Sequence, residues 1–225
     1  DRPNRYTVRA VVEPEEALIE AQVPVPGHHR DLLAAGARLW VRPPASERER
    51  YTVVLVQLAK GGLVCLDDAL SAPLVGHAIA EEALPELTGL EIVREDVPFG
   101  TSRFAFELGG VLGPRTLVEV ITATLVENGA ALFPAGRDPR ATRQVRSLSR
   151  GAQRGQVAAA VVFVVPRVDA RVVMAARPMD AEFTEALREA AASGVRILAR
   201  RCQVTLEELV LGVPLEVKIP APPPA

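Results

Sequence analysis

The chain has 225 residues, of which 48% are hydrophobic and 24% charged, and its formal net charge is −2. This composition is typical of a folded protein with one large domain or two small ones, and it excludes a global electrostatic attraction to nucleic acid. The longest apolar run, 157–166, is about half as long as a membrane-spanning helix, so we expect no membrane segment and a cytoplasmic location. Cys65 and Cys202 are expected to be buried free thiols rather than a disulfide.

Residues 1–70 are predicted to form an all-β module. Turn signals rich in Gly and Pro separate five short runs with strand-like composition, and no long helical pattern interrupts them. Five short strands of this kind favour a small closed sheet, so we predict an OB-like β-barrel. The five runs are 5–12, 17–23, 37–43, 51–59 and 62–67. His28, His29 and Asp31 lie in a predicted turn between the second and third runs.

Residues 71–219 are predicted to form an α/β domain, because helical and strand-like patterns alternate along them. We expect Ser71 to cap the first helix and the apolar run 157–166 to be a strand buried on both faces. A mixed sheet between helices follows from this order. The helices are expected at 71–87, 138–155 and 180–194, and the strands at 90–97, 102–108, 115–126, 157–166 and 195–204, with a hairpin or meander at 208–219. The Pro-rich tail, 220–225, is predicted to be disordered.

Five segments, taken in order, resemble the sugar fermentation stimulation protein A (SfsA) family. They are "PGHHRDLLAAGARLWV" (26–41), "RERYTVVLV" (48–56), "REDVPFGTSRFAF" (94–106), "LVEVITATLVENGAALFP" (117–134) and "GVRILARRCQVTLEELVLGVPLEV" (194–217). Members of the family pair an N-terminal OB-like domain with a restriction-endonuclease-like domain of the PD-(D/E)XK superfamily. The resemblance therefore implies a mixed α+β fold and a nuclease-like scaffold.

The catalytic motif that the resemblance implies is degenerate in this chain. The aspartate of the family's "SRxDF" is replaced by Ala105, and the lysine of its "EVK" is replaced by Ile121. Of the two acids and one lysine that the family motif implies, only Glu119 remains. Phosphodiester cleavage needs a divalent ion that binds phosphate and activates water, and Mg²⁺ is held by carboxylates. Glu119 is therefore expected to bind Mg²⁺ or Mn²⁺ weakly, if at all, and no cofactor is expected unless other ligands compensate.

Two residues are candidate replacements for the lost groups. Glu107 lies two positions after Ala105, so on a regular strand it faces the same way but about 6.5–7 Å further along. Arg143, from the helix expected at 138–155, can supply the missing positive charge, although a guanidinium cannot act as a base.

Six arginines with only Asp138 to oppose them follow the motif. From the second onward they are spaced by three or four residues, which places them on one stripe of the predicted helix. Such a stripe suits the phosphates of DNA or RNA; the alternative is a solvated face that pairs with nearby acids. The six are Arg137, Arg140, Arg143, Arg146, Arg150 and Arg154.

Three hypotheses follow. The chain is a catalytically inactive relative of a nuclease that still binds nucleic acid, which the sequence favours, with a homodimer left open. Alternatively it is an active metal-dependent nuclease whose ligands, including Glu119 and Glu107, have moved. The third hypothesis is a protein-interaction scaffold with no nucleic acid role.

Overall fold

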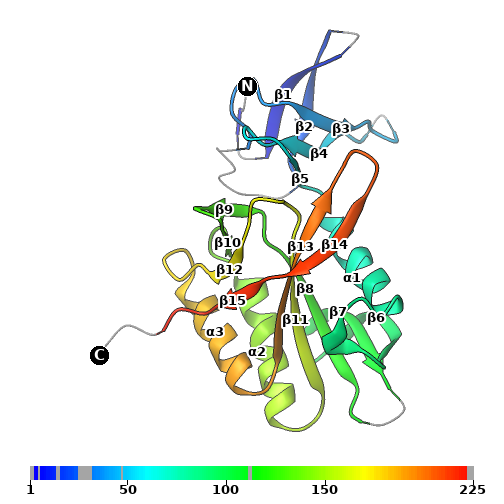
Figure 1. Ribbon diagram of the computed structural model, residues 1–225, viewed down its shortest axis with the longest axis vertical. Helices are drawn as coiled ribbons and strands as arrows, with labels where there is room; N and C mark the ends of the chain where they lie inside the picture. Colours follow the sequence, from blue (N-terminus) through cyan, green and yellow to red (C-terminus); the bar gives the residue numbers. More distant parts are fainter. Residues whose placement is uncertain are drawn as a thin grey trace.

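Figure 1 shows the computed structural model of the chain, which describes residues 3–4, 6–13, 16–24, 32–46, 48–110 and 113–221. A small all-β front module sits at one end of a larger unit of mixed sheet and helices, so the predicted mixed α and β class is confirmed. Within these residues no helix has the length and apolarity to cross a bilayer. The predicted turn at His28, His29 and Asp31 and the last four residues of the Pro-rich tail lie outside the described residues.

All five predicted strands of the front module form, but the predicted barrel closure is not found among the described residues. The sheet order is β1-β2-β4-β3, with β5 paired to β4, and in the described residues no pairing joins β1 to β3. A bulge between Trp40 and Val41 interrupts the β3–β4 register and bends this edge strand. The strands are β1 Thr7–Val12, β2 Ala17–Gln22, β3 Leu39–Arg42, β4 Tyr51–Gln57 and β5 Leu63–Cys65.

The larger unit is built on a six-stranded mixed sheet of order β14-β13-β11-β8-β7-β6. Its centre, β8, β11 and β13, is parallel, and the outer strands are antiparallel. The strands are β6 Glu91–Phe99, β7 Ser102–Gly109, β8 Thr116–Thr122, β11 Ala158–Val165, β13 Arg196–Val204 and β14 Leu209–Pro214. Strand β11 is buried along almost its whole length, which confirms the prediction for the apolar run.

Helices cover both faces of this sheet. α1 (Ser71–Ala80) packs on one face over a cluster that includes Val75 and Phe106, while α2 (Pro139–Gln153) and α3 (Ala181–Ala192) pack on the other around Leu148 and Phe183. Two short 3-10 turns, Asp68–Leu70 and Pro85–Leu87, flank α1. Both cysteines are buried and free within the α1 cluster, as predicted.

Ser71 does not cap α1, contrary to the prediction. Leu70 occupies the cap position, and the Ser71 hydroxyl instead accepts a hydrogen bond from Thr122 Oγ1 at 2.7 Å. The preceding 3-10 turn continues directly into α1, so the helix has no separate capping loop. Ser71 thereby joins the start of α1 to the end of β8.

A second, four-stranded sheet was not predicted. The expected strand 115–126 is divided between two sheets, because the chain leaves the large sheet after Thr122. At this break the Thr124 carbonyl accepts a hydrogen bond from Arg167 Nη1 at 2.7 Å. The second sheet has the order β15-β12-β10-β9, with β9 Leu125–Glu127, β10 Ala130–Phe133, β12 Val172–Ala175 and β15 Glu216–Lys218.

Candidate functional site

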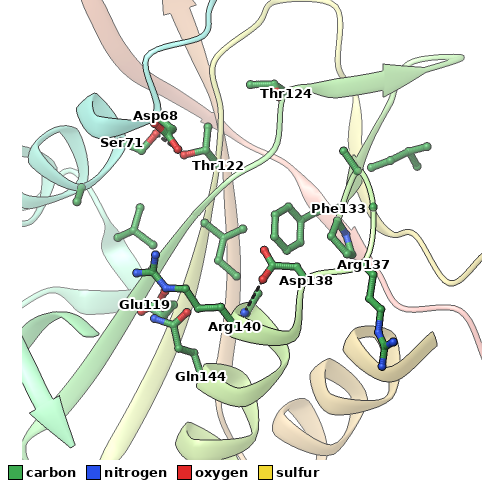
Figure 2. Close-up of a pocket in the computed structure, with 18 of the residues that line it drawn as sticks. Asp68, Ser71, Glu119, Thr122, Thr124, Phe133, Arg137, Asp138, Arg140 and Gln144 are labelled. Atoms are coloured by element: carbon green, nitrogen blue, oxygen red, sulfur yellow. Dashed lines mark hydrogen bonds between the residues drawn. The ribbon is translucent and has the colours of Figure 1, made fainter. Parts of the chain in front are cut away.

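A cleft of about 710 Å³ opens where β8 ends, between the front module, the start of α1 and the N-terminal end of α2. Figure 2 shows side chains converging on it from these separate elements. The residues that matter for its chemistry are Asp68, Glu119, Thr122, Phe133, Arg140 and Gln144. The cleft is therefore assembled from parts of the chain that are far apart in sequence.

Linked helix caps fix the N-terminal end of α2 at this cleft. The Asp138 carboxylate accepts from the Ala141 N–H at 2.9 Å, and Asp180 caps α3 by accepting from the Phe183 N–H at 3.0 Å. Asp180 also accepts from the backbone N–H of Asp138 at 2.9 Å. Carboxylates in such positions satisfy helix N–H groups that would otherwise lack partners. The linked caps thus fix the N-terminal ends of α2 and α3, and the cleft wall there, relative to each other.

Glu119 is the buried acid of the cleft, with 8% of its surface exposed. Burial raises the pKa of its carboxyl group to about 8, and the positive charge of Arg140 and the Gln144 side chain lower that pKa only in part. The nearby Asp138 charge raises it further. Without a bound cation, the folded chain therefore favours the protonated form of this carboxyl group at neutral pH.

Neither replaced position supplies a polar group beside Glu119. Regular pairing between β7 and β8 ends at Phe106 and Val118, one residue short of Ala105 and Glu119. Ala105 has only a methyl group to offer there. Ile121 lines the cleft floor but is 6% exposed and belongs to the hydrophobic core under α2. The position of the family's lysine is thus part of the core.

Glu107 lies outside the cleft. It pairs with Leu117 in the β7–β8 ladder, and its carboxylate is 3.6 Å from Arg115 Nη1. Because the residue lies two positions further along β7 than Ala105, its carboxylate is directed to an ion pair at the other end of the sheet.

Two groups that the sequence did not single out for the cleft come from α2. Arg140 and Gln144 are four residues apart, and this spacing puts both side chains on one helix face, next to Glu119 (Figure 2). Gln144 also donates from Nε2 to the Arg103 carbonyl at 2.9 Å, which ties α2 to β7. The i, i+4 spacing was visible in the sequence, but which helix face meets β8 was not.

Asp68 and a pair of hydroxyl groups form the opposite wall. Burial raises the pKa of the Asp68 carboxyl group and the neighbouring Asp67 charge adds to this, whereas the charge of Arg140 lowers it. Asp67 itself accepts from Arg42 Nη1 at 2.8 Å and so connects this wall to the front module. Asp68 lies beside Ser71 and Thr122 in Figure 2. The sequence indicated only a turn or cap for these two aspartates.

The six arginines divide into three groups. Arg140 enters the cleft, while Arg137 and Arg146 form ion pairs with Glu182 (3.3 Å) and Glu189 (3.9 Å) of α3. The remaining three lie exposed along the outer side of α2 or just after it and have no ion pair in the part of the chain that the structure describes. These three, Arg143, Arg150 and Arg154, are called the arginine stripe below. Arg143 does not line the cleft.

Comparisons with known proteins place the chain in a family. The family model described as "Sugar fermentation stimulation protein RE domain" matches residues 69–208. A sugar fermentation stimulation protein homolog from Moorella thermoacetica is 36% identical over 97% of this chain and 94% of its own length, and a homolog from Methanothermobacter thermautotrophicus is 32% identical over 96% and 88%. The chain belongs to the sugar fermentation stimulation protein family.

A solved structure of an SfsA protein supports the fold assignment. The structure of Pyrococcus furiosus SfsA in complex with Ca²⁺ matches with a TM-score of 0.85 and 26% identity, covering 97% of this chain and 93% of that protein. Since both modules are included, the similarity extends over the whole arrangement of the SfsA family chain in Figure 1.

The donors in the cleft of this SfsA-family chain do not fit a divalent cation. In the described ranges no three Asp, Glu, His or Cys side chains gather closely enough to hold a metal ion. Ala105 supplies no oxygen, and the Arg140 side chain carries its positive charge toward Glu119. Mg²⁺ and Ca²⁺ take six or more oxygen ligands, which include carboxylates of the protein. No catalytic step through a metal is therefore derived for this cleft.

Proposed function

We propose that this SfsA-family chain binds nucleic acid along α2 without cutting it, on an OB-like front module and a nuclease-like scaffold. The arginine stripe carries the proposal. Its three guanidinium groups are exposed and, within the described residues, have no ion pair, whereas Arg146 of α2 and Arg137 just before the helix are paired with acids of α3. If this face of α2 served to form ion pairs, the three arginines of the stripe would be paired as well. No acid of α3 lies within 4 Å of them.

The geometry of the stripe suits a phosphate backbone. Arg143 and Arg154 are eleven residues apart, which along a helix corresponds to about 16 Å. Phosphates of one DNA strand follow one another about every 3.4 Å along the duplex axis, so the stripe can reach several. Because the net charge of the chain is −2, binding depends on this local patch and is expected to weaken steeply with salt.

Removing the arginine stripe is expected to weaken binding of a labelled 20-base-pair DNA duplex about 10- to 100-fold at roughly 0.1 M salt. The variant is Arg143→Gln with Arg150→Gln and Arg154→Gln, measured by fluorescence anisotropy across a salt series. Its slope of log affinity against log salt should be smaller by about 2–3, since each lost phosphate contact contributes about 0.9.

A charge-matched control uses three exposed arginines away from α2: Arg48→Gln, Arg50→Gln and Arg94→Gln. This control should bind the duplex within a factor of about three of the unmodified chain. Equal losses in both triple variants would mean that only the total charge matters. Undetectable binding by the unmodified chain at low salt would favour the protein-interaction scaffold.

The absence of cutting is supported by the donor set around Glu119. The Pyrococcus furiosus relative was solved in complex with Ca²⁺, and we propose that the cleft of this chain does not bind a catalytic ion. DNA and RNA, single- and double-stranded, incubated with Mg²⁺ or Mn²⁺ should show no cleavage that distinguishes the chain from its Glu119→Ala variant. Cleavage that Glu119→Ala abolishes would establish the alternative, a nuclease with relocated ligands.

A further inference from the structure

Arg140 lines the cleft with an exposed side chain. Its charge acts on Glu119 at one wall and on Asp68 at the other, lowering the pKa of both carboxyl groups against the effect of burial. In Figure 2 the side chain extends from the first turn of α2 toward Glu119. The Arg140 charge thus acts on two acids that come from separate elements, and Ala105 stands where the family's second acid would be. In this respect Arg140 takes the place of a bound cation.

The guanidinium group of Arg140 is nevertheless not tied to either acid. In the described part of the chain no carboxylate lies within 4 Å of it, in contrast to Arg137, three residues earlier, which is 3.3 Å from Glu182. The guanidinium group of Arg140 therefore has no ion pair among the described residues and is available to a ligand in the cleft.

We propose that Arg140 replaces the divalent ion of the cleft and binds a phosphate group of a nucleotide there, without any metal. The proposal rests on the proposed function, because it takes the nucleic acid bound along α2 as the source of the nucleotide. It goes further in naming a separate subsite, its residue and its independence of metal.

The chemistry of the cleft suits this ligand. A guanidinium group offers five N–H donors in a planar arrangement that matches phosphate oxygens, and it remains charged at all accessible pH values. On the opposite wall the hydroxyl groups of Thr122 and Ser71 line the cleft, where Thr122 Oγ1 donates to Ser71 Oγ at 2.7 Å. The volume of about 710 Å³ lies in the range of small-molecule sites.

Aromatic groups border the same space. Tyr6 of the front module and Phe133 at the end of β10 both line the cleft. The Phe133 ring is fixed by packing on Phe183, with ring centroids 5.0 Å apart. Nucleobases stack on such rings with little dependence on sequence. A bound nucleotide would thus meet a cation at its phosphate and apolar rings at its base.

The test uses thymidine 3′,5′-bisphosphate, a probe that fits the cleft but is too short to span the arginine stripe. Isothermal titration with excess EDTA should show binding, and replacing EDTA by Ca²⁺ or Mn²⁺ should change the affinity by less than about threefold. Arg140→Gln should weaken binding at least about tenfold, and Arg140→Lys should retain part of it, because lysine keeps the charge but not the planar donor set.

Arg94→Gln is the matched control, since it removes the same charge from an exposed position of β6, outside both the cleft and the arginine stripe, and should leave probe binding unchanged. Thermal unfolding of each variant establishes that it is folded. Binding that appears only with a divalent ion would overturn the proposal, and so would equal binding by the Arg140→Gln and Arg94→Gln variants, or no binding by the unmodified chain.

The outcomes separate this proposal from the proposed function. A chain that binds duplex DNA through the arginine stripe but ignores the bisphosphate contradicts the Arg140 subsite alone. A chain that binds the bisphosphate through Arg140 but shows no stripe-dependent duplex binding contradicts the α2 interface alone.

Discussion

Replacing Arg167 with alanine is expected to lower the free energy of unfolding by roughly 3 kcal/mol. The side chain is 2% exposed. Its guanidinium group donates to both carboxylate oxygens of Asp169, at 2.7 and 2.8 Å, and to the Thr124 carbonyl at 2.7 Å. Alanine leaves a cavity and an unsatisfied carbonyl where the chain passes from the large sheet to the small one.

The loss should be measured by urea denaturation and compared with Arg137→Ala. Arg137 and Glu182 form an exposed ion pair, and removing such a pair costs about 0–1 kcal/mol. The backbone next to Arg167 also joins the two modules, since the Cys65 N–H donates to the Pro166 carbonyl at 3.0 Å. Similar stability losses in the two variants would contradict a structural role for the buried arginine.

Glu119→Gln is expected to change how stability depends on pH. The pKa of the Glu119 carboxyl group is about 8 in the folded chain, compared with an ordinary value of 4.5. Folding thus favours the protonated form of this group. Its contribution to the free energy of unfolding is complete below pH 4.5, falls as the pH rises, and is absent above about pH 8. The slope in that window is about 1.4 kcal/mol per pH unit, and the total loss is on the order of a few kcal/mol.

Glutamine cannot ionise, so the variant should gain stability relative to the unmodified chain as pH rises from 4.5 to 8. The measurement is the free energy of unfolding of both proteins at several pH values. Glu107→Gln is the control, because it makes the same chemical change outside the cleft and should follow the unmodified chain. A constant difference between Glu119→Gln and the unmodified chain at all pH values would contradict a buried, protonated Glu119.

Much of the fold followed from local pattern. Turn residues and strand-like composition located the strands of the front module, and the continuous apolar run of β11 identified a strand covered on both faces. Barrel closure was not found among the described residues, because closure depends on pairing between distant strands, which no local pattern indicates. The β8–β9 break was missed for a similar reason, since a buried arginine 43 residues away holds it.

The candidate site was likewise predicted only in part from the sequence. The motif identified Glu119 and the loss of its partners at Ala105 and Ile121, because these residues are adjacent in sequence or on neighbouring strands. Arg140 was recognised only as one member of a basic helix. Its position beside Glu119 depends on the rotation of α2 about its axis, which the caps at Asp138 and Asp180 and the packing of its apolar face determine.

The sequence by itself determined the order of helices and strands, the family resemblance, the loss of two motif residues and the abundance of arginine on one helix. Each of these is a property of neighbouring residues, governed by local backbone preference and side-chain chemistry. The tertiary structure decided which arginines are already neutralised, which one enters the cleft, and that Glu119 is buried deeply enough to keep its proton. Those properties depend on distance through space and on exclusion of water, and both arise only when remote segments pack together.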